Sequence, residues 1–202
     1  GKDIKVKIMS APIKFNREDV IEKAKNLYWE KGYHATSMRN LQDVVNMHPG
    51  SIYAAFGSKD KLFTESLNRY AADGAKRLAD CIEQKDTVLD GLKHFIHTVI
   101  VCNSATAPSG MCMIVKTVAE LTQNDSPDLL AHATNILEGI EASFAVLFGQ
   151  AIDSGEISAE KDPVELARYF QIQIIGLRTY AQVTNDNDAV EKYIDDIFKN
   201  IV

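Results

Sequence analysis

The chain contains 202 residues, 46% of them hydrophobic and 25% charged, with a formal net charge of −6 at pH 7, as in an ordinary globular protein. No run of about 18 apolar residues occurs, which excludes a membrane-spanning helix, and the first 15 residues lack the apolar core of a secretory signal. Three cysteines at unmatched spacings (Cys81, Cys102 and Cys112) argue against a disulfide framework, so we expect a reducing, cytoplasmic location.

Apolar residues recur at helical spacing along the chain. In chain order, the pattern predicts helices over residues 16–32, 36–46, 49–55, 58–84, 87–102, 111–123, 128–154, 163–183 and 188–202. No segment alternates with the period of two that strands require. We therefore predict an all-α fold of about nine helices, three in an amino-terminal head and the rest in a body entered through the fourth helix.

The two short helices within residues 36–56 form a helix-turn-helix unit. Thr36 or Ser37 serves as the N-cap of the first helix, and Asn46 suits the left-handed residue that ends it. Pro49 suits the first position of the second helix, where no amide donor is needed. Two short helices joined by a tight turn are the unit that places a helix in the major groove of DNA.

The charge is divided unevenly along the chain. Residues 1–62 carry 11 Lys and Arg against 7 Asp and Glu, a net charge of +4, and residues 63–202 carry 11 against 21, a net charge of −10. The positive charge therefore lies on the segment with the helix-turn-helix unit, as phosphate binding requires.

This segment resembles the amino-terminal domain of TetR/AcrR-family repressors. The residues that carry the resemblance are Gly32-Tyr33-x-Ala35-Thr36-Ser37 and Gly50-Ser51-Ile52-Tyr53-x-x-Phe56-x-Ser58-Lys59-x-x-Leu62-Phe63. The resemblance implies a DNA-binding domain over residues 1–62 and an effector-binding and dimerisation domain over residues 63–202. Pro49 replaces a basic residue of many relatives, and Ala54 and Ala55 replace large ones, so a larger share of specificity should come from DNA shape.

The residues expected to enter the groove lie at the amino end of the second short helix. They are His48, Pro49, Gly50 and Ser51. Ser51 can hydrogen-bond to either base type, His48 can donate to a base or a phosphate, and Gly50 lets the backbone come close. Phosphate contacts are expected from Thr36, Ser37, Arg39, Tyr53 and Lys59.

Several of these residues have a purely structural alternative. Thr36 and Ser58 are also explained as helix caps, Tyr53 as a packed residue of the head, and Lys59 and Lys61 as solvated charges. A basic arm precedes the first helix and either touches a neighbouring phosphate or minor groove or has no role. Its lysines are Lys2, Lys5, Lys7 and Lys14.

Residues 109–121 look like a stretch found in one subgroup of the family, where Gly-Cys opens the sixth helix. Here Met111 stands between Gly110 and Cys112. Some members of that subgroup sense electrophiles or oxidants through a cysteine, which makes Cys112 a regulatory candidate by resemblance. A cysteine in the first turn of a helix ionises more easily, because it feels the positive end of the helix dipole. The alternative is that Cys112 is a small buried hydrophobe.

Other effector-side candidates come from the predicted body. His94 and His97 share a helical face, which suits either two metal ligands or the wall of a ligand cavity, but no companion cluster supports a metal. An apolar cavity would be lined by aromatic residues that are equally explained as core, namely Phe95, Phe144, Phe148 and Tyr169.

The helix over residues 163–183 has more apolar surface than one core face needs. With the last helix it is expected to form a two-fold, four-helix dimer interface, which the family resemblance also implies. The interface candidates are Phe170, Ile174, Gly176, Leu177 and Ala181.

These features predict a homodimeric transcriptional repressor that a small-molecule effector releases from a palindromic operator. One alternative is a thiol-based redox or electrophile switch acting through Cys112. A remote one is a helical enzyme or metal-binding protein, but the sequence contains no Glu-x-x-His pair, nucleophile elbow, phosphate-binding glycine loop or zinc spacing. We therefore expect no catalytic residues, no metal, no cofactor and no membrane partner.

Overall fold

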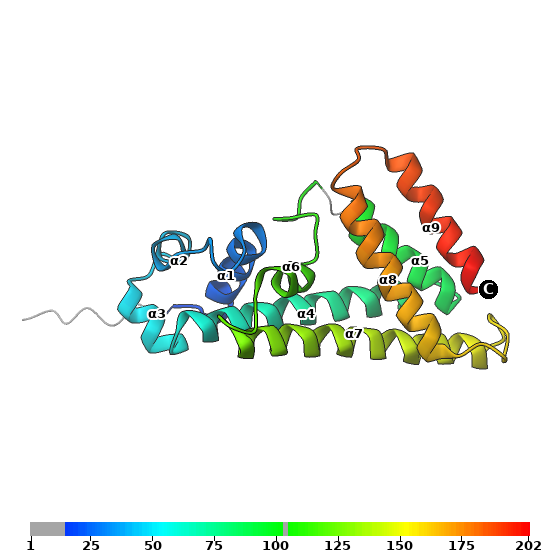
Figure 1. Cartoon of the computed structure of the whole chain (residues 1–202), viewed down its shortest axis with the longest axis horizontal. Helices are drawn as coiled ribbons and strands as arrows, with labels where there is room; N and C mark the ends of the chain where they lie inside the picture. Colours follow the sequence, from blue (N-terminus) through cyan, green and yellow to red (C-terminus); the bar gives the residue numbers. More distant parts are fainter. Residues whose placement is uncertain (1–14, 103–104) are drawn as a thin grey trace, which may run out of the picture.

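The computed structural model describes residues 15–102 and 105–202, and within them the chain is all-α, without strands (Figure 1). The elements are α1 (Arg17–Lys31), α2 (Met38–Val45), α3 (Pro49–Phe56), α4 (Lys59–Glu83), α5 (Val88–His97), a π-helical turn (Thr98–Cys102), α6 (Met113–Glu120), α7 (Pro127–Asp153), α8 (Pro163–Ala181) and α9 (Asn187–Ile201). The predicted fold class is confirmed. The lysines of the basic arm lie outside the described residues.

The helix starts of the head follow from local capping chemistry. Asn16 accepts hydrogen bonds from the Glu18 and Asp19 amides at the start of α1. Ser37 caps α2 in a reciprocal capping box with Asn40, and Ser58 caps α4. Each side chain satisfies an amide that the first helical turn leaves unpaired.

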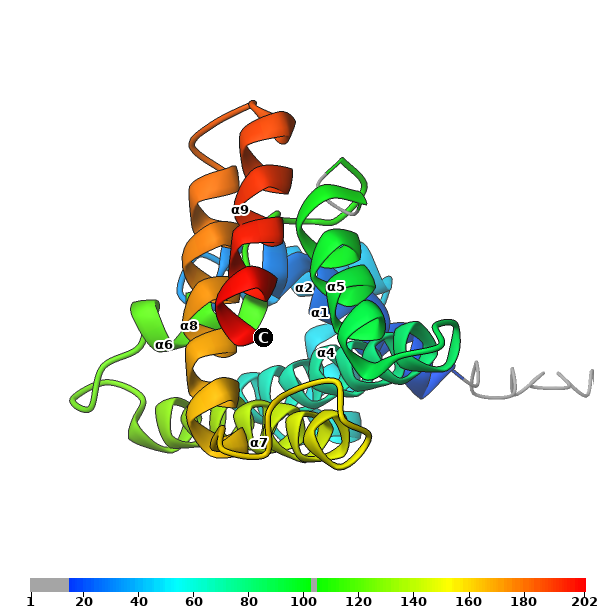
Figure 2. The ribbon, with the colours of Figure 1, turned by 90° about the vertical axis from the view of Figure 1, so that its right-hand side faces the viewer.

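Helices α4 and α7 run side by side along the length of the molecule in both views (Figures 1 and 2). The head, α1–α3, packs at one end of this pair, and α5, α8 and α9 rise from the other end. Helix α6 lies between these two groups and touches α1, α4 and α7. None of the helices in the described part of the chain is long and apolar enough to cross a membrane.

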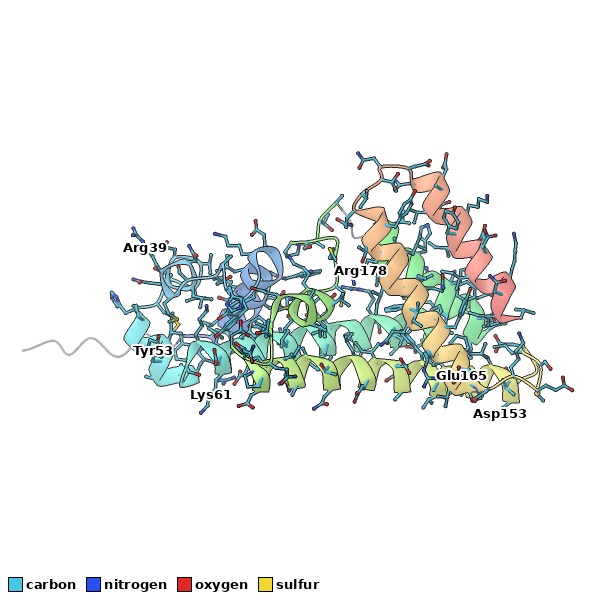
Figure 3. All side chains as sticks on the ribbon, in the orientation of Figure 1. Arg39, Tyr53, Lys61, Asp153, Glu165 and Arg178 are labelled. Carbon is cyan, nitrogen blue, oxygen red and sulfur yellow. The ribbon has the colours of Figure 1, made fainter. Side chains whose placement is uncertain are left out.

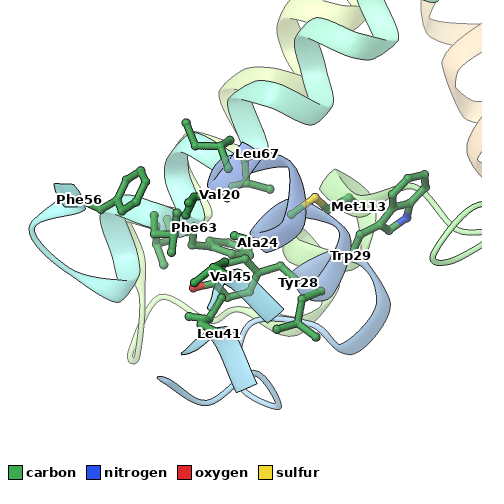
Figure 4. Close-up of a cluster of buried hydrophobic side chains, with 14 of the residues drawn as sticks. Val20, Ala24, Tyr28, Trp29, Leu41, Val45, Phe56, Phe63, Leu67 and Met113 are labelled. Carbon is green, nitrogen blue, oxygen red and sulfur yellow. The ribbon is translucent and has the colours of Figure 1, made fainter. Parts of the chain in front are cut away.

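The buried residues form two clusters. The head core joins side chains of α1–α4, such as Tyr28, Leu41 and Phe63, to Met113 and Ile114 of α6 (Figure 4). The body core joins α5, α7, α8 and α9 around a set of edge-to-face phenylalanines, Phe144, Phe148, Phe170 and Phe198. Because α6 contributes to the head core, the head is not packed on α4 alone.

Two helices differ most from their predicted bounds. Helix α6 is shorter than residues 111–123, because the Met111 carbonyl accepts a hydrogen bond from the Trp29 indole and Asp125 accepts bonds from the amide and hydroxyl of Thr122. Cys112 is consequently the N-cap of α6 and not a residue of its first turn. The helix predicted to end at Cys102 closes with a π-helical turn.

Candidate nucleic-acid interface and ligand cavity

The turn between α2 and α3 leaves the amino end of α3 at the surface. Asn46 adopts a left-handed conformation with φ of 53°, and Pro49 occupies the first turn of α3. Ile52 and Phe56 anchor the inner face of α3 in the head core. The opposite face is therefore free to meet a partner.

Most of the predicted DNA-contacting residues are accessible at the surface of the head. Ser37, Arg39, His48, Gly50, Ser51 and Tyr53 are exposed, and Pro49 is half-buried. Arg39 and Tyr53 are labelled at the head end of Figure 3. A Cβ added to Gly50 would meet no atom within 4 Å, so packing inside the protein does not require glycine there. This space is consistent with close approach of another molecule.

The expectation for Thr36 is wrong. Its side chain is fully buried, and its hydroxyl donates to the Gly32 carbonyl at 2.6 Å. It is neither available to a phosphate nor the cap of α2, because the neighbouring Ser37 has that role. Two adjacent hydroxyl residues compete for one cap, and the chain places Thr36 inward.

Lys59 is half-buried and has partners inside the head. Its Nζ donates to the Tyr33 carbonyl at 3.0 Å and lies 4.2 Å from the centre of the Tyr33 ring. Burial lowers the pKa of Lys59, and the nearby Asp60 and Glu120 oppose that shift. A phosphate contact from Lys59 stays a prediction, and the exposed Lys61 is a second cation on the same helical turn (Figure 3).

A cavity of about 630 Å³ lies between α4, α5, α7, α8 and the start of α6. Phe95 and Phe144 line it, as expected, together with Trp29, Tyr70 and Cys112. The walls are mainly apolar, which is the composition of small-molecule sites.

The other predicted cavity residues lie elsewhere. Phe148 is fully buried against Phe170 in the body core, and the Tyr169 hydroxyl meets Asn200 of α9. His94 and His97 share a face, but this face lies toward α9, where His97 Nε2 is 3.2 Å from Glu191. The turn of α5 that points Phe95 into the cavity directs both histidines away from it. No three metal-binding side chains gather anywhere in the described residues.

Three hydrogen bonds hold polar groups at one end of the cavity. Arg178 Nε donates to the Gly110 carbonyl at 2.7 Å, and its Nη1 donates to the Tyr70 hydroxyl at 3.1 Å. Burial raises the pKa of Tyr70, so its hydroxyl stays protonated and neutral while it accepts the bond from Arg178. Trp29 packs edge-on against Tyr70, with ring centres 4.9 Å apart, and its indole Nε1 donates to the Met111 carbonyl at 2.7 Å.

Helix α6 also binds the head through two side chains one turn apart, which we call the α6 clamp. Lys116 Nζ donates to the Trp29 carbonyl at 2.6 Å and the Glu30 carbonyl at 3.1 Å, at the end of α1. The Glu120 carboxylate accepts from the Tyr33 amide at 2.9 Å and the His34 amide at 2.7 Å. Sequence reasoning missed the clamp; its only signal was a Lys and a Glu four residues apart on one predicted helix.

The dimer candidates on α8 need correction. Phe170 and Leu177 are buried in the body core, and Ile174 lines the ligand cavity, so these three are occupied within one chain. Gly176 is exposed and Ala181 is half-buried. Large apolar side chains are left exposed on α8, after α8 and on α9, namely Val164 (48%), Ile172 (60%), Tyr180 (48%), Val183 (83%) and Tyr193 (49%). Helix α8 does carry more apolar residues than one buried face needs, but its more apolar face packs in the core of the same chain.

Both parts of the chain match known families. Residues 20–65 match the family described as bacterial regulatory proteins, tetR family, and residues 88–197 match the tetracyclin repressor-like C-terminal domain. The HTH-type transcriptional repressor ComR of Escherichia coli is 27% identical over 173 residues, 85% of this chain and 81% of ComR. The repressor BdcR of the same species is 32% identical over 110 residues, 54% of this chain and 56% of BdcR.

Solved structures show the same fold. A cysteine mutant of the TetR-family regulator CifR, complexed with a 26 bp operator DNA, superposes with a TM-score of 0.85 at 21% identity, covering 96% of this chain and all of that one. The reduced form of Escherichia coli NemR superposes with a TM-score of 0.79 at 20% identity, covering 92% of this chain and 97% of NemR.

A helix-turn-helix head packed on a helical body defines a DNA-binding transcriptional regulator. The chain belongs to the TetR family of bacterial regulatory proteins.

Proposed function

We propose that this regulator is a homodimeric repressor that a small-molecule effector, bound in the cavity, releases from a palindromic operator. The observation that carries this proposal is the position of α6. Val115 of α6 and the two residues before the helix, Met111 and Cys112, line the cavity, and the clamp residues of α6 hold the end of α1. One helix therefore touches both the ligand cavity and the DNA-binding head.

DNA recognition is assigned to the exposed end of α3. His48, Pro49, Gly50 and Ser51 face the groove, with Ser51 and His48 as the groups able to discriminate bases. Ser37, Arg39, Tyr53 and Lys59 contact phosphates and set the position of the head. With few base-specific donors, DNA shape contributes more to specificity.

Dimerisation is assigned to the exposed apolar residues on α8 and α9, here called the α8–α9 stripe. It comprises Ile172, Gly176, Tyr180, Val183 and Tyr193. A two-fold axis through this stripe pairs two bodies and presents two heads, which matches two half-sites of a palindrome.

Regulation follows from linkage between the two sites. An effector that favours one position of α6 favours the corresponding position of the head, and it lowers DNA affinity only if the two states bind it differently. A route through α4 operates in parallel, because α4 starts in the head and lines the cavity.

A thiol switch at Cys112 is the second candidate function. Cys112 is half-buried, lines the cavity and precedes α6, so an adduct there would enter the same space as an effector. Mild peroxide or quinone treatment followed by mass spectrometry, with operator affinity measured for the wild type and Cys112→Ser, tests this switch. An unchanged response in the variant removes it.

The main proposal is tested by selecting bound DNA from a random pool and then screening small molecules for release of the winning site. We expect a palindrome whose affinity falls steeply with salt. Ser51→Ala and His48→Ala should change base preference, whereas Tyr53→Phe should weaken all sequences alike. Failure to enrich any sequence, together with no binding to duplex DNA at low salt, would overturn it.

A further inference from the structure

One end of the cavity carries a positive charge without a balancing acid. Arg178 is half-buried, lines the cavity and lies on the side of α8 that faces α6 (Figure 3). Its two hydrogen bonds go to neutral acceptors, the Gly110 carbonyl and the Tyr70 hydroxyl. Among residues 15–102 and 105–202, no carboxylate oxygen lies within 4.0 Å of its nitrogens.

This arrangement leaves part of the guanidinium without a protein acceptor in the described part of the chain. A guanidinium has five N–H donors, and the two bonds of Arg178 use only Nε and Nη1. Neutral acceptors compensate only partly for taking a charge out of water. A carboxylate would add charge neutralisation and a second pair of hydrogen bonds, and the planar guanidinium is shaped for it.

The remaining charges that line the cavity do not supply this acid. Lys25 and Asp73 are paired with each other, with Nζ and a carboxylate oxygen 2.9 Å apart. Arg77 and Glu83 stand on α4 with opposite signs. Arg77 likewise has no carboxylate oxygen within 4.0 Å among the described residues, but of these two arginines only Arg178 is held in the lining by hydrogen bonds of its guanidinium. The net charge of these five residues is positive.

The rest of the cavity suits an apolar body. Residues of α4, α5, the π-helical turn after α5 and α7 supply this wall, including Leu78, Ile82, Phe95, Val99, Phe144 and Leu147. A volume of about 630 Å³ falls within the roughly 300–1,000 Å³ of sites for drug-sized ligands. The lining therefore combines a cationic end with a mainly apolar wall, in which Gln171 and Ser143 are polar.

We propose that the cavity binds an apolar monocarboxylate, with its carboxylate on Arg178 and its hydrocarbon body against the α4, α5 and α7 wall. The inference rests on the proposed function, because it names the chemical class of the effector for the same site. The ligand carboxylate competes with the Gly110 carbonyl for Arg178. Gly110 adjoins Met111, whose carbonyl holds Trp29 of the head, so binding acts on the joint between α1 and α6.

The test uses the full-length protein without DNA and follows the fluorescence of Trp29, the single tryptophan of the chain. The probes are decanoate, 1-decanol and decylammonium, which share one chain and differ in the charge of the head group. Saturable binding is expected to follow the order decanoate, decanol, decylammonium, with decanoate at least about tenfold tighter than decanol.

The variant Arg178→Met should lose this preference and still bind decanol within about twofold of the wild type. Decanol binding shows that the cavity of the variant is intact. Arg178→Lys should keep a reduced preference for decanoate, because the charge remains and the two-pronged geometry does not. The matched control is Arg168→Met, an arginine on the outside of the same helix that pairs with Glu141 and Glu165. It should bind all probes as the wild type does.

Equal binding of decanoate and decanol, unchanged decanoate binding in Arg178→Met, or no binding of any probe would overturn the inference. Operator release is measured separately by adding decanoate to the protein–DNA complex. Arg178-dependent binding without release would leave the ligand class standing and refute the proposed mode of regulation. Release by molecules whose binding does not depend on Arg178 would support the proposed mode of regulation and refute the ligand class.

Discussion

Glu120 is predicted to hold the DNA-binding head in its observed position, and replacing it with alanine tests this role. Its carboxylate accepts two backbone hydrogen bonds, from the Tyr33 amide at 2.9 Å and the His34 amide at 2.7 Å. A hydrogen bond to a charged acceptor contributes about 1.5–3 kcal/mol when buried. Both amides lie near the surface, so in the variant water can replace part of the lost hydrogen-bond energy. We therefore expect Glu120→Ala to lower the free energy of unfolding by about 1–3 kcal/mol.

The assay is urea denaturation, combined with hydrogen exchange of the backbone amides that follow α1. The matched control is Glu138→Ala, an exposed glutamate of α7 whose side chain makes no hydrogen bond or ion pair within the described part of the chain. The Tyr33 and His34 amides should exchange faster in Glu120→Ala and not in the control. If the two variants unfold within about 0.5 kcal/mol of each other and both keep slow exchange, the clamp does not hold the head.

Three further predictions concern the other sites. Gly50→Ala should leave the protein as stable as the wild type or up to about 1 kcal/mol more stable, because the Cβ of the alanine would meet no atom within 4 Å. The same substitution should weaken operator binding in a gel-shift titration, and an unchanged affinity would place α3 away from DNA. Ile172→Glu should leave the helical circular dichroism intact and shift sedimentation toward monomer, and a dimer that persists would exclude this stripe. Burial raises the pKa of three tyrosines above the usual value of about 10, so in an alkaline absorbance titration they should ionise only as the chain unfolds. Because a tyrosine of the unfolded chain loses its proton at a lower pH than the same residue in the folded chain, the free energy of unfolding should fall as the pH rises above about 10. The three tyrosines are Tyr28, Tyr33 and Tyr70, and their ionisation in the native state would contradict their burial.

Local features of the fold could be predicted from the sequence because their causes lie within a few residues. Asn16, Ser37 and Ser58 cap their helices through side-chain bonds to amides two or three residues on. Asn46 and Pro49 mark the turn for similarly local reasons. The helix-turn-helix and the all-α class followed from these signals and from the apolar period.

Features that depend on distant partners could not be predicted in this way. Periodicity shows that α8 has an apolar surplus, but only packing decides that Phe170 faces the body core and Ile172 faces outward. The same holds for His97, whose neighbour Glu191 is 94 residues away. The clamp of Glu120 on His34 spans 86 residues, and no spacing rule connects them.

The presence of Met113 and Ile114 among the buried side chains of α1–α4 affects how this protein could be engineered. A fragment cut after the third helix would leave a hole where these two residues sit, and a deletion of buried side chains of this size costs about 2–5 kcal/mol for each. A chimera that transplants the operator-reading segment onto another sensor must therefore carry matching residues from the middle of the chain. Covariation between relatives should therefore link residues near 113 with residues near 28, although position 28 lies in the DNA-binding head and position 113 lies outside it.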